Sequence, residues 1–175
     1  MYAKRIRLVT VCGLFISAGI LIPMVFHAFG LGKVFLPMHI PVLIAGILYG
    51  PEYGLITGLI TPGLSAVLTG MPPLMPPTAQ AMTFELAAYG VLSGLLTHRV
   101  GLGVVPSLVG AMIGGRIVYG LFGASLLPLL GLTRVPVLYS LTAGLVSSLP
   151  GVPLQLVLVP AIVTLLRRHQ RRLNT

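Results

Sequence analysis

The stretch LVTVCGLFISAGILIPMVFHA, residues 8–28, contains no Asp, Glu, Lys or Arg. A helix needs about 20 predominantly apolar residues to cross the hydrocarbon core of a bilayer. This stretch therefore predicts a transmembrane helix, and the basic cluster Lys4, Arg5 and Arg7 directly precedes it. Such a cluster also begins a signal peptide, but no small-x-small cleavage site follows, so we expect the helix to be retained.

The composition of the whole chain extends this conclusion. Of its 175 residues, 56% are hydrophobic and 7% are charged, with a mean hydropathy of +1.04. A soluble domain carries about 25% charged residues, so an ordinary soluble domain is excluded and the chain is expected to reside in a lipid bilayer. Its carboxylate side chains are Glu52 and Glu85, which disfavours any chemistry that needs several carboxylates.

Other classes of function are also disfavoured by the sequence. The net charge is +9, but the basic residues lie at the chain ends and in short loops without an aromatic ladder, so we expect no nucleic-acid partner. The single cysteine, Cys12, excludes an intrachain disulfide and a cysteine-rich metal site. There is no phosphate-binding Gly-x-x-x-x-Gly-Lys loop and no His-Glu-x-x-His motif. We therefore expect no metal, no cofactor and no enzymatic activity.

Proline, glycine and charge divide residues 1–175 into a single all-α integral-membrane domain, a bundle of six transmembrane helices. The predicted helices cover residues 8–28, 34–49, 53–68, 78–96, 104–126 and 138–166. Four prolines between Gly70 and Thr78 predict a stiff apolar loop, because proline lacks an N–H and clashes with the preceding helical turn. Pro150 and Pro153 predict a kink or interruption in the last helix.

The distribution of basic residues predicts the orientation of the bundle. With six spans and a cytoplasmic N-terminus, Lys33 and Arg134 fall outside, and the inner side collects eight basic residues: Lys4, Arg5, Arg7, Arg99, Arg167, Arg168, Arg171 and Arg172. Cytoplasmic loops carry an excess of Lys and Arg. We therefore expect both termini in the cytoplasm and the proline-rich loop on the outer side of a multi-pass protein.

Two charged residues fall within predicted helices, Glu85 and Arg116. At 1.5 Å per residue, Glu85 lies about 10 Å and Arg116 about 15 Å from the outer surface, so they are expected at overlapping depths. Because a charge at this depth costs about 2.5–3.5 kcal/mol, the two side chains are expected to pair with each other, to line a small-molecule pocket, or to exchange one role for the other when a ligand binds. A guanidinium suits a substrate carboxylate.

Several uncharged residues are candidates for the same pocket. Met82 and Tyr89 are at helical spacing from Glu85, and Tyr119 follows Arg116 by one turn. Gln155 is a polar residue in apolar surroundings. Each of these residues can equally be ordinary core, whereas His27 and His39, near the outer ends of the first two helices, are expected at the membrane interface.

Small residues four apart recur along the chain. The pairs are Gly13 and Ser17, Gly46 and Gly50, Gly54 and Gly58, Gly90 and Gly94, and Gly110 and Gly114. Such spacing permits close helix packing in membranes. The pair on the first helix is of most interest, because a terminal helix has an outward face available to a partner.

The most distinctive motifs are LPMHIPVLIAGILYGPEYG (residues 36–54), GLITPGLSAVLTGMPP (residues 58–73) and MTFELAAYG (residues 82–90). With these motifs the chain resembles, over nearly its whole length, the substrate-binding S components of energy-coupling factor (ECF) transporters. The similarity is to the general branch that includes pantothenate and pyridoxine carriers.

This resemblance implies a vitamin-binding membrane subunit of an importer in the prokaryotic plasma membrane. Its implied partners are a membrane coupling subunit and two ATPase subunits, and the vitamin is bound outside and released inside. The family's first helix meets the coupling subunit through two alanines, whose place Gly13 and Ser17 occupy here. The implied substrate site contains Glu85, Arg116, Gln155 and the loop from Met71 to Met75, which would close over the vitamin.

The identity of the substrate stays open at this point. A buried arginine favours an anionic vitamin such as pantothenate, but a neutral vitamin such as a pyridoxine form fits equally well if Glu85 already neutralises Arg116. Two rivals come from other classes of protein: a small intramembrane enzyme with Glu85 as general base, and a membrane scaffold without a ligand.

Overall fold

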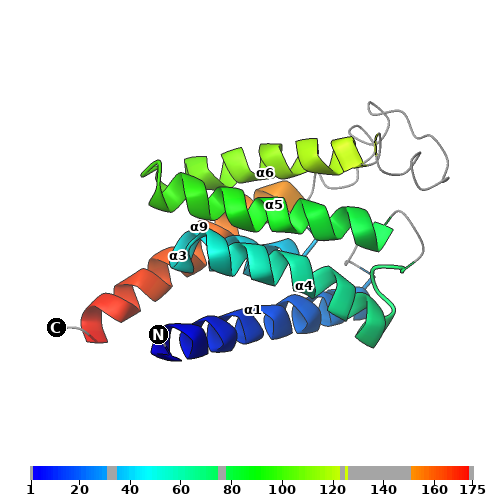
Figure 1. Ribbon diagram of the computed structural model, residues 1–175, viewed down its shortest axis with the longest axis horizontal. Helices are drawn as coiled ribbons and strands as arrows, with labels where there is room; N and C mark the ends of the chain where they lie inside the picture. The colour runs from blue at the N-terminus through cyan, green and yellow to red at the C-terminus, as the bar shows by residue number, and fades with distance from the viewer. Residues whose placement is uncertain (1, 31–34, 75–77, 123–124, 126–150, 174–175) are drawn as a thin grey trace.

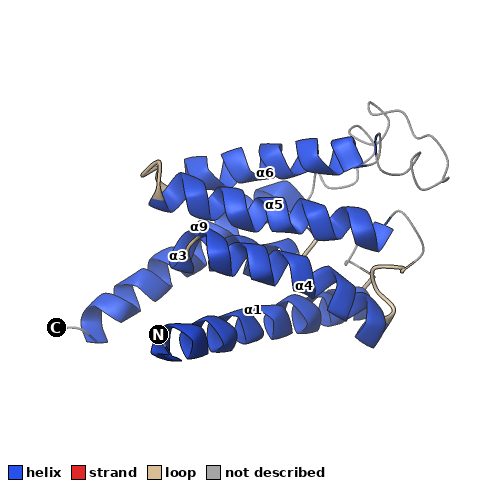
Figure 2. Ribbon diagram, viewed as in Figure 1, coloured by secondary structure: helices blue, strands red, loops and turns tan. Residues whose placement is uncertain are grey.

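The computed structural model describes residues 2–30, 35–74, 78–122, 125 and 151–173, and these residues contain six α-helices and no strand (Figure 2). The helices are α1 (Tyr2–Ala28), α3 (His39–Tyr49), α4 (Pro51–Thr69), α5 (Thr78–His98), α6 (Val104–Leu121) and α9 (Gly151–Leu173). The all-helical prediction is confirmed for this part of the chain.

Helix α3 forms the centre of the bundle. It contacts α1, α4, α5, α6 and α9, and every residue from His39 to Ile47 is buried. Its 11 residues give a length of about 16 Å, which is too short to cross a bilayer. The predicted helix over residues 34–49 was therefore wrong in its start. The chain breaks at Leu36, which has a φ of 46° and precedes a proline, a position that disfavours helical geometry.

Helices α4 and α5 pack through glycines at backbone contact. A Cβ atom added to Gly54 would collide with the backbone of Gly90, and one added to Gly90 would collide with the backbone of Gly54. Gly58 is equally close to the backbone of Leu86, and Gly94 to that of Pro51. The small-residue pairs of these two helices therefore serve packing within the bundle, where van der Waals contact holds membrane helices together.

Helix α1 lies at the edge of the bundle beside α3 and α4 (Figure 1). It begins at Tyr2, six residues before the predicted start at Leu8, so Lys4, Arg5 and Arg7 belong to its first two turns. The basic residues extend the helix because Lys and Arg are good helix formers. Its 27 residues make it about 40 Å long, longer than the hydrocarbon core of about 30 Å.

The ends of the last two helices differ from the prediction. Helix α6 is described to Leu121, and most of the predicted remainder, residues 122–126, lies outside the described residues. Helix α9 runs from Gly151 to Leu173, beyond the predicted end at residue 166, and residues 138–150 also lie outside the described part. Pro153 lies in α9, and Pro150, the other residue of the predicted kink, lies outside the described residues, so the kink stays a prediction.

Both ends of the described chain lie at the same end of the bundle, on the left of Figure 1. The described Lys and Arg residues other than Arg116 belong to the first turns of α1, the turn after α5 and the last turns of α9, all at that end. Among the described helices, α1, α6 and residues 151–169 of α9 are long and apolar enough to cross a membrane. Six spans therefore stay a prediction.

Candidate functional site

A buried ion pair joins α5 to α6. Nη1 of Arg116 lies 3.0 Å from Oε1 of Glu85, and the two side chains are 16% and 3% exposed. The two residues therefore lie at the same depth, as their positions along the helices predicted. Their pairing keeps either charge from facing an apolar environment alone, which would be costly in a membrane.

Tyr89 completes this cluster from the next turn of α5. Its hydroxyl donates a hydrogen bond of 2.9 Å to Oε1 of Glu85, four residues earlier, and Tyr89 itself is 2% exposed. The ring has room because the facing residue on α6 is Gly115, where a Cβ atom would collide with the Tyr89 ring. Glycine next to Arg116 thus lets the phenol and the guanidinium meet at one carboxylate.

His39 extends the cluster to α3, and its expected interfacial position was wrong. The imidazole is 2% exposed, and its centroid lies 5.1 Å from that of the Tyr89 ring. Its Nδ1 lies 3.1 Å from the carbonyl oxygen of Leu36, while Nε2 is buried without a hydrogen-bond partner. No local signal distinguished this position, because a helix that is hydrophobic on all sides is typical both of a buried core helix and of a membrane span that faces lipid.

The remaining candidates on α5 and α6 are Met82 and Tyr119, both partly buried. Met82 is partly buried against the main hydrophobic core, which includes Tyr89. Tyr119 is half-buried and packs against Ala81 and Phe122. No contact of Met82 or Tyr119 with Glu85 or Arg116 is described, so their place in one site with the ion pair stays a prediction.

Gln155 supplies a further buried polar group from α9. The residue is 2% exposed and its Oε1 has no hydrogen-bond partner. Because buried polar atoms are rarely left unpaired, the unpaired oxygens and nitrogens of a native structure call for an explanation such as a ligand or water. The structure gives no contact that joins Gln155 to Glu85 or Arg116, so its place in one site with them stays a prediction.

The described part of the proline-rich loop is hydrogen-bonded to both helices that flank it, α4 and α5. Ser65 on α4 donates a hydrogen bond of 2.7 Å to the carbonyl oxygen of Met71, and Gln80 on α5 donates one of 3.1 Å to that of Leu74. The Met71 side chain is 44% exposed. Met75, the other predicted loop contact, lies outside the described residues.

Gly13 and Ser17 both lie on the exposed side of α1. A Cβ atom added to Gly13 would meet nothing within 4 Å, and the Ser17 hydroxyl donates to the carbonyl oxygen of Gly13 at 2.8 Å. The hydroxyl is therefore satisfied within the helix. Gly13 therefore faces open space outside the bundle, unlike the glycines between α4 and α5.

Comparison with protein families gives one match that covers most of the chain. The model of the ECF transporter substrate-specific component matches residues 7–163. Searches of curated proteins and of solved structures gave no match. No cluster of three metal-ligating side chains occurs among the described residues. The chain therefore belongs to the family of ECF transporter substrate-specific components, integral membrane subunits that bind a small-molecule substrate for an importer and are not enzymes.

Proposed function

We propose that the chain binds a water-soluble vitamin outside the prokaryotic plasma membrane and delivers it inward through a partner module of one membrane coupling subunit and two ATPase subunits. In this proposal six helices span the bilayer and both termini are cytoplasmic. The common end of the described basic residues supports that orientation, because cytoplasmic segments are enriched in Lys and Arg.

The observation that carries the proposal is the buried cluster of Glu85, Arg116 and Tyr89, with the unpaired His39 Nε2 beside it. Glu85 lies about 10 Å from the start of α5, at the end of the bundle away from the basic residues. A purely structural membrane bundle has no need for polar groups at that depth, since each one costs free energy. A ligand that enters from outside would give the unpaired His39 Nε2 a partner.

The hydrogen-bonding capacity of the cluster bears on the class of vitamin. His39 Nδ1 lies at a carbonyl oxygen, which can only accept, so Nε2 carries the lone pair and needs a donor. The unpaired Oε1 of Gln155 also needs a donor. Pantothenate offers hydroxyl and amide donors together with a carboxylate that can take the place of Glu85 at Arg116, and we favour it. A pyridoxine form, with hydroxyl donors and no carboxylate, is the alternative.

Isothermal titration of the detergent-purified chain against a vitamin panel tests the proposal. The panel contains pantothenate, pyridoxine forms, folate, riboflavin, niacin and lipoate, and calorimetry suits a chain that has no Trp for fluorescence. We expect saturable one-to-one binding of one compound, with pantothenate first. Absence of binding across the panel by protein that unfolds cooperatively would contradict the vitamin assignment.

The exposed face of α1 is the proposed contact with the coupling subunit. Gly13 and Ser17 lie among exposed apolar side chains that include Val9 and Leu21, 72% and 60% exposed. Small residues allow a partner helix to approach closely and slide. Gly13→Leu or Ser17→Leu should therefore abolish vitamin uptake in cells while the purified variant keeps its vitamin affinity.

Gly63→Leu on α4 is the matched control for this surface. A Cβ atom at Gly63 also meets nothing within 4 Å, but the residue lies on a different helix. Uptake should survive this substitution. If the Gly13 and Ser17 variants still assembled with the coupling module and supported uptake, the contact would lie elsewhere.

A further inference from the structure

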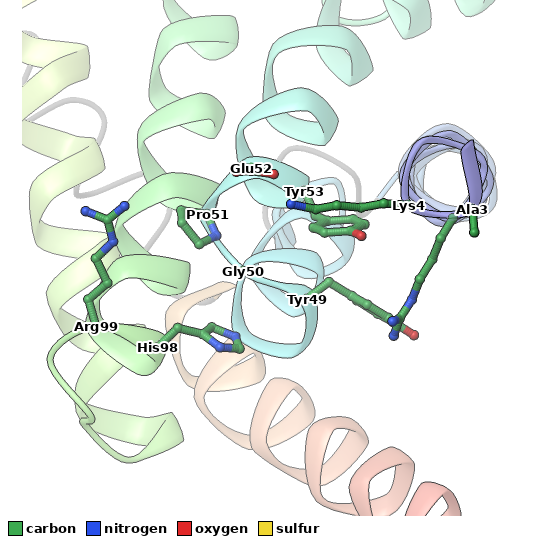
Figure 3. Close-up of a pocket in the computed structure, with 10 residues that line it drawn as sticks. Ala3, Lys4, Tyr49, Gly50, Pro51, Glu52, Tyr53, His98 and Arg99 are labelled. Carbon is green, nitrogen blue, oxygen red and sulfur yellow. The ribbon is translucent and has the colours of Figure 1, made fainter. Parts of the chain in front are cut away.

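A hollow of about 660 Å³ opens at the end of the bundle that carries the described termini. Three segments line it: the first turns of α1, the turn between α3 and α4, and the end of α5 (Figure 3). It lies at the opposite end from Glu85, which is near the start of α5. The hollow is therefore separate from the proposed vitamin site.

The hollow has an excess of positive charge. Lys4, Arg7 and Arg99 line it together with one carboxylate, Glu52. Among the described residues, no ion pair within 4.0 Å involves any of these four side chains. The charges are therefore gathered around open space and are not paired with one another, an arrangement that suits an anion.

Two tyrosines shape the hollow beside these charges. The guanidinium carbon of Arg7 lies 5.9 Å from the centre of the Tyr49 ring, and the Tyr49 and Tyr53 rings lie 5.5 Å apart. Figure 3 shows Lys4 extended from α1 in the direction of Tyr53. Tyrosine is enriched where a membrane protein crosses from the acyl chains to the headgroups, so the lining itself indicates headgroup depth.

The length of α1 also places the hollow at the depth of the lipid headgroups. A helix of about 40 Å exceeds the hydrocarbon core by about 10 Å, so the turns with Lys4 and Arg7 extend into the headgroup region. Farther along α4, exposed apolar side chains follow, such as Leu55 and Leu59. Helices α1 and α4 pack together there, with the Cys12 sulfur 3.8 Å from the Tyr53 carbonyl oxygen.

The hollow is cationic, and the helix surface next to it is apolar. Together they are complementary to an amphiphile that has an anionic headgroup and acyl chains. An acidic protein segment would use the charges but would leave the apolar surface without a role. We propose that this hollow binds the phosphate headgroup of an anionic membrane lipid, with Lys4 and Arg7 as its main contacts and the acyl chains along α4. Each basic side chain near an anionic lipid surface contributes to such binding.

Native mass spectrometry of the detergent-purified full chain tests this assignment. The chain is mixed with phosphatidylglycerol and phosphatidylcholine that carry the same acyl chains, and we expect it to retain phosphatidylglycerol preferentially. Lys4→Gln with Arg7→Gln should weaken that retention by about tenfold or more. Arg5→Gln with Arg168→Gln removes the same charge from exposed positions outside the hollow and should leave retention unchanged.

Three outcomes would overturn the proposal. Equal loss of lipid in both double variants would mean that net charge, and not the hollow, attracts the lipid. Retention of inorganic phosphate without phosphatidylglycerol would identify a soluble anion as the ligand. Failure to retain lipid, combined with loss of assembly with the coupling module in the Lys4 and Arg7 variant alone, would identify a protein partner. Vitamin titration on the same samples keeps this result distinct from the vitamin assignment.

Discussion

Gly90→Ala should prevent the chain from folding stably, although it adds a single methyl group. The Cβ atom would collide with the backbone of Gly54, and neither α4 nor α5 can move away without breaking the neighbouring contact between Gly58 and Leu86. Overpacking a well-packed interior typically costs about 1–3 kcal/mol, and more where the obstacle is backbone. Because the clash here is between two main chains, we expect a cost at or above the upper end of that range.

Gly63→Ala is the matched control for this experiment. It makes the same chemical change inside α4, but the added Cβ atom meets nothing within 4 Å. Alanine has a higher helix propensity than glycine by up to about 1 kcal/mol, so this variant should be as stable as the parent or more stable. Thermal unfolding followed by size-exclusion chromatography in detergent compares the two. Equal melting temperatures for Gly90→Ala and the parent would disprove the close packing of α4 and α5.

The sequence predicted the bounds of the helices better than it predicted which helices pack against each other. Apolar runs bounded by proline, glycine and charge located α4, α5 and the start of α6 to within about two residues, because those signals are local. Small-residue spacing was visible, but it could not tell that Gly54 and Gly90 face each other while Gly13 faces outward. That distinction depends on which helices pack together, which no single helix encodes.

The candidate site divides in a similar way. Glu85 and Arg116 were predicted at overlapping depths because helical rise converts sequence position into depth, and the structure pairs them. His39 was misplaced because proximity to a helix end was taken as proximity to the membrane surface. The start of α3 is instead covered by its neighbours, so its first residue is as buried as its middle. The position of His39 along its helix therefore did not predict whether neighbouring helices would shield it from lipid.

Arg116→Gln should destabilise the chain and weaken vitamin binding together. Removing one member of a buried ion pair costs about 3–5 kcal/mol, because the other charge is left without a partner. Here that charge would be Glu85, which is 2% exposed and would retain the Tyr89 hydroxyl as a donor. The loss of binding should be at least about tenfold, equivalent to about 1.4 kcal/mol, if the guanidinium holds a substrate carboxylate.

The double variant Glu85→Gln with Arg116→Gln separates the structural role of the pair from its role in binding. Two neutral amides can hydrogen-bond to each other, and the amide oxygen at position 85 can still accept from Tyr89, so the melting temperature should return close to that of the parent. Vitamin affinity should stay at least about tenfold weaker, because no cation faces the ligand. A double variant that regained both stability and affinity would show that Glu85 and Arg116 hold the bundle together and take no part in recognising the vitamin.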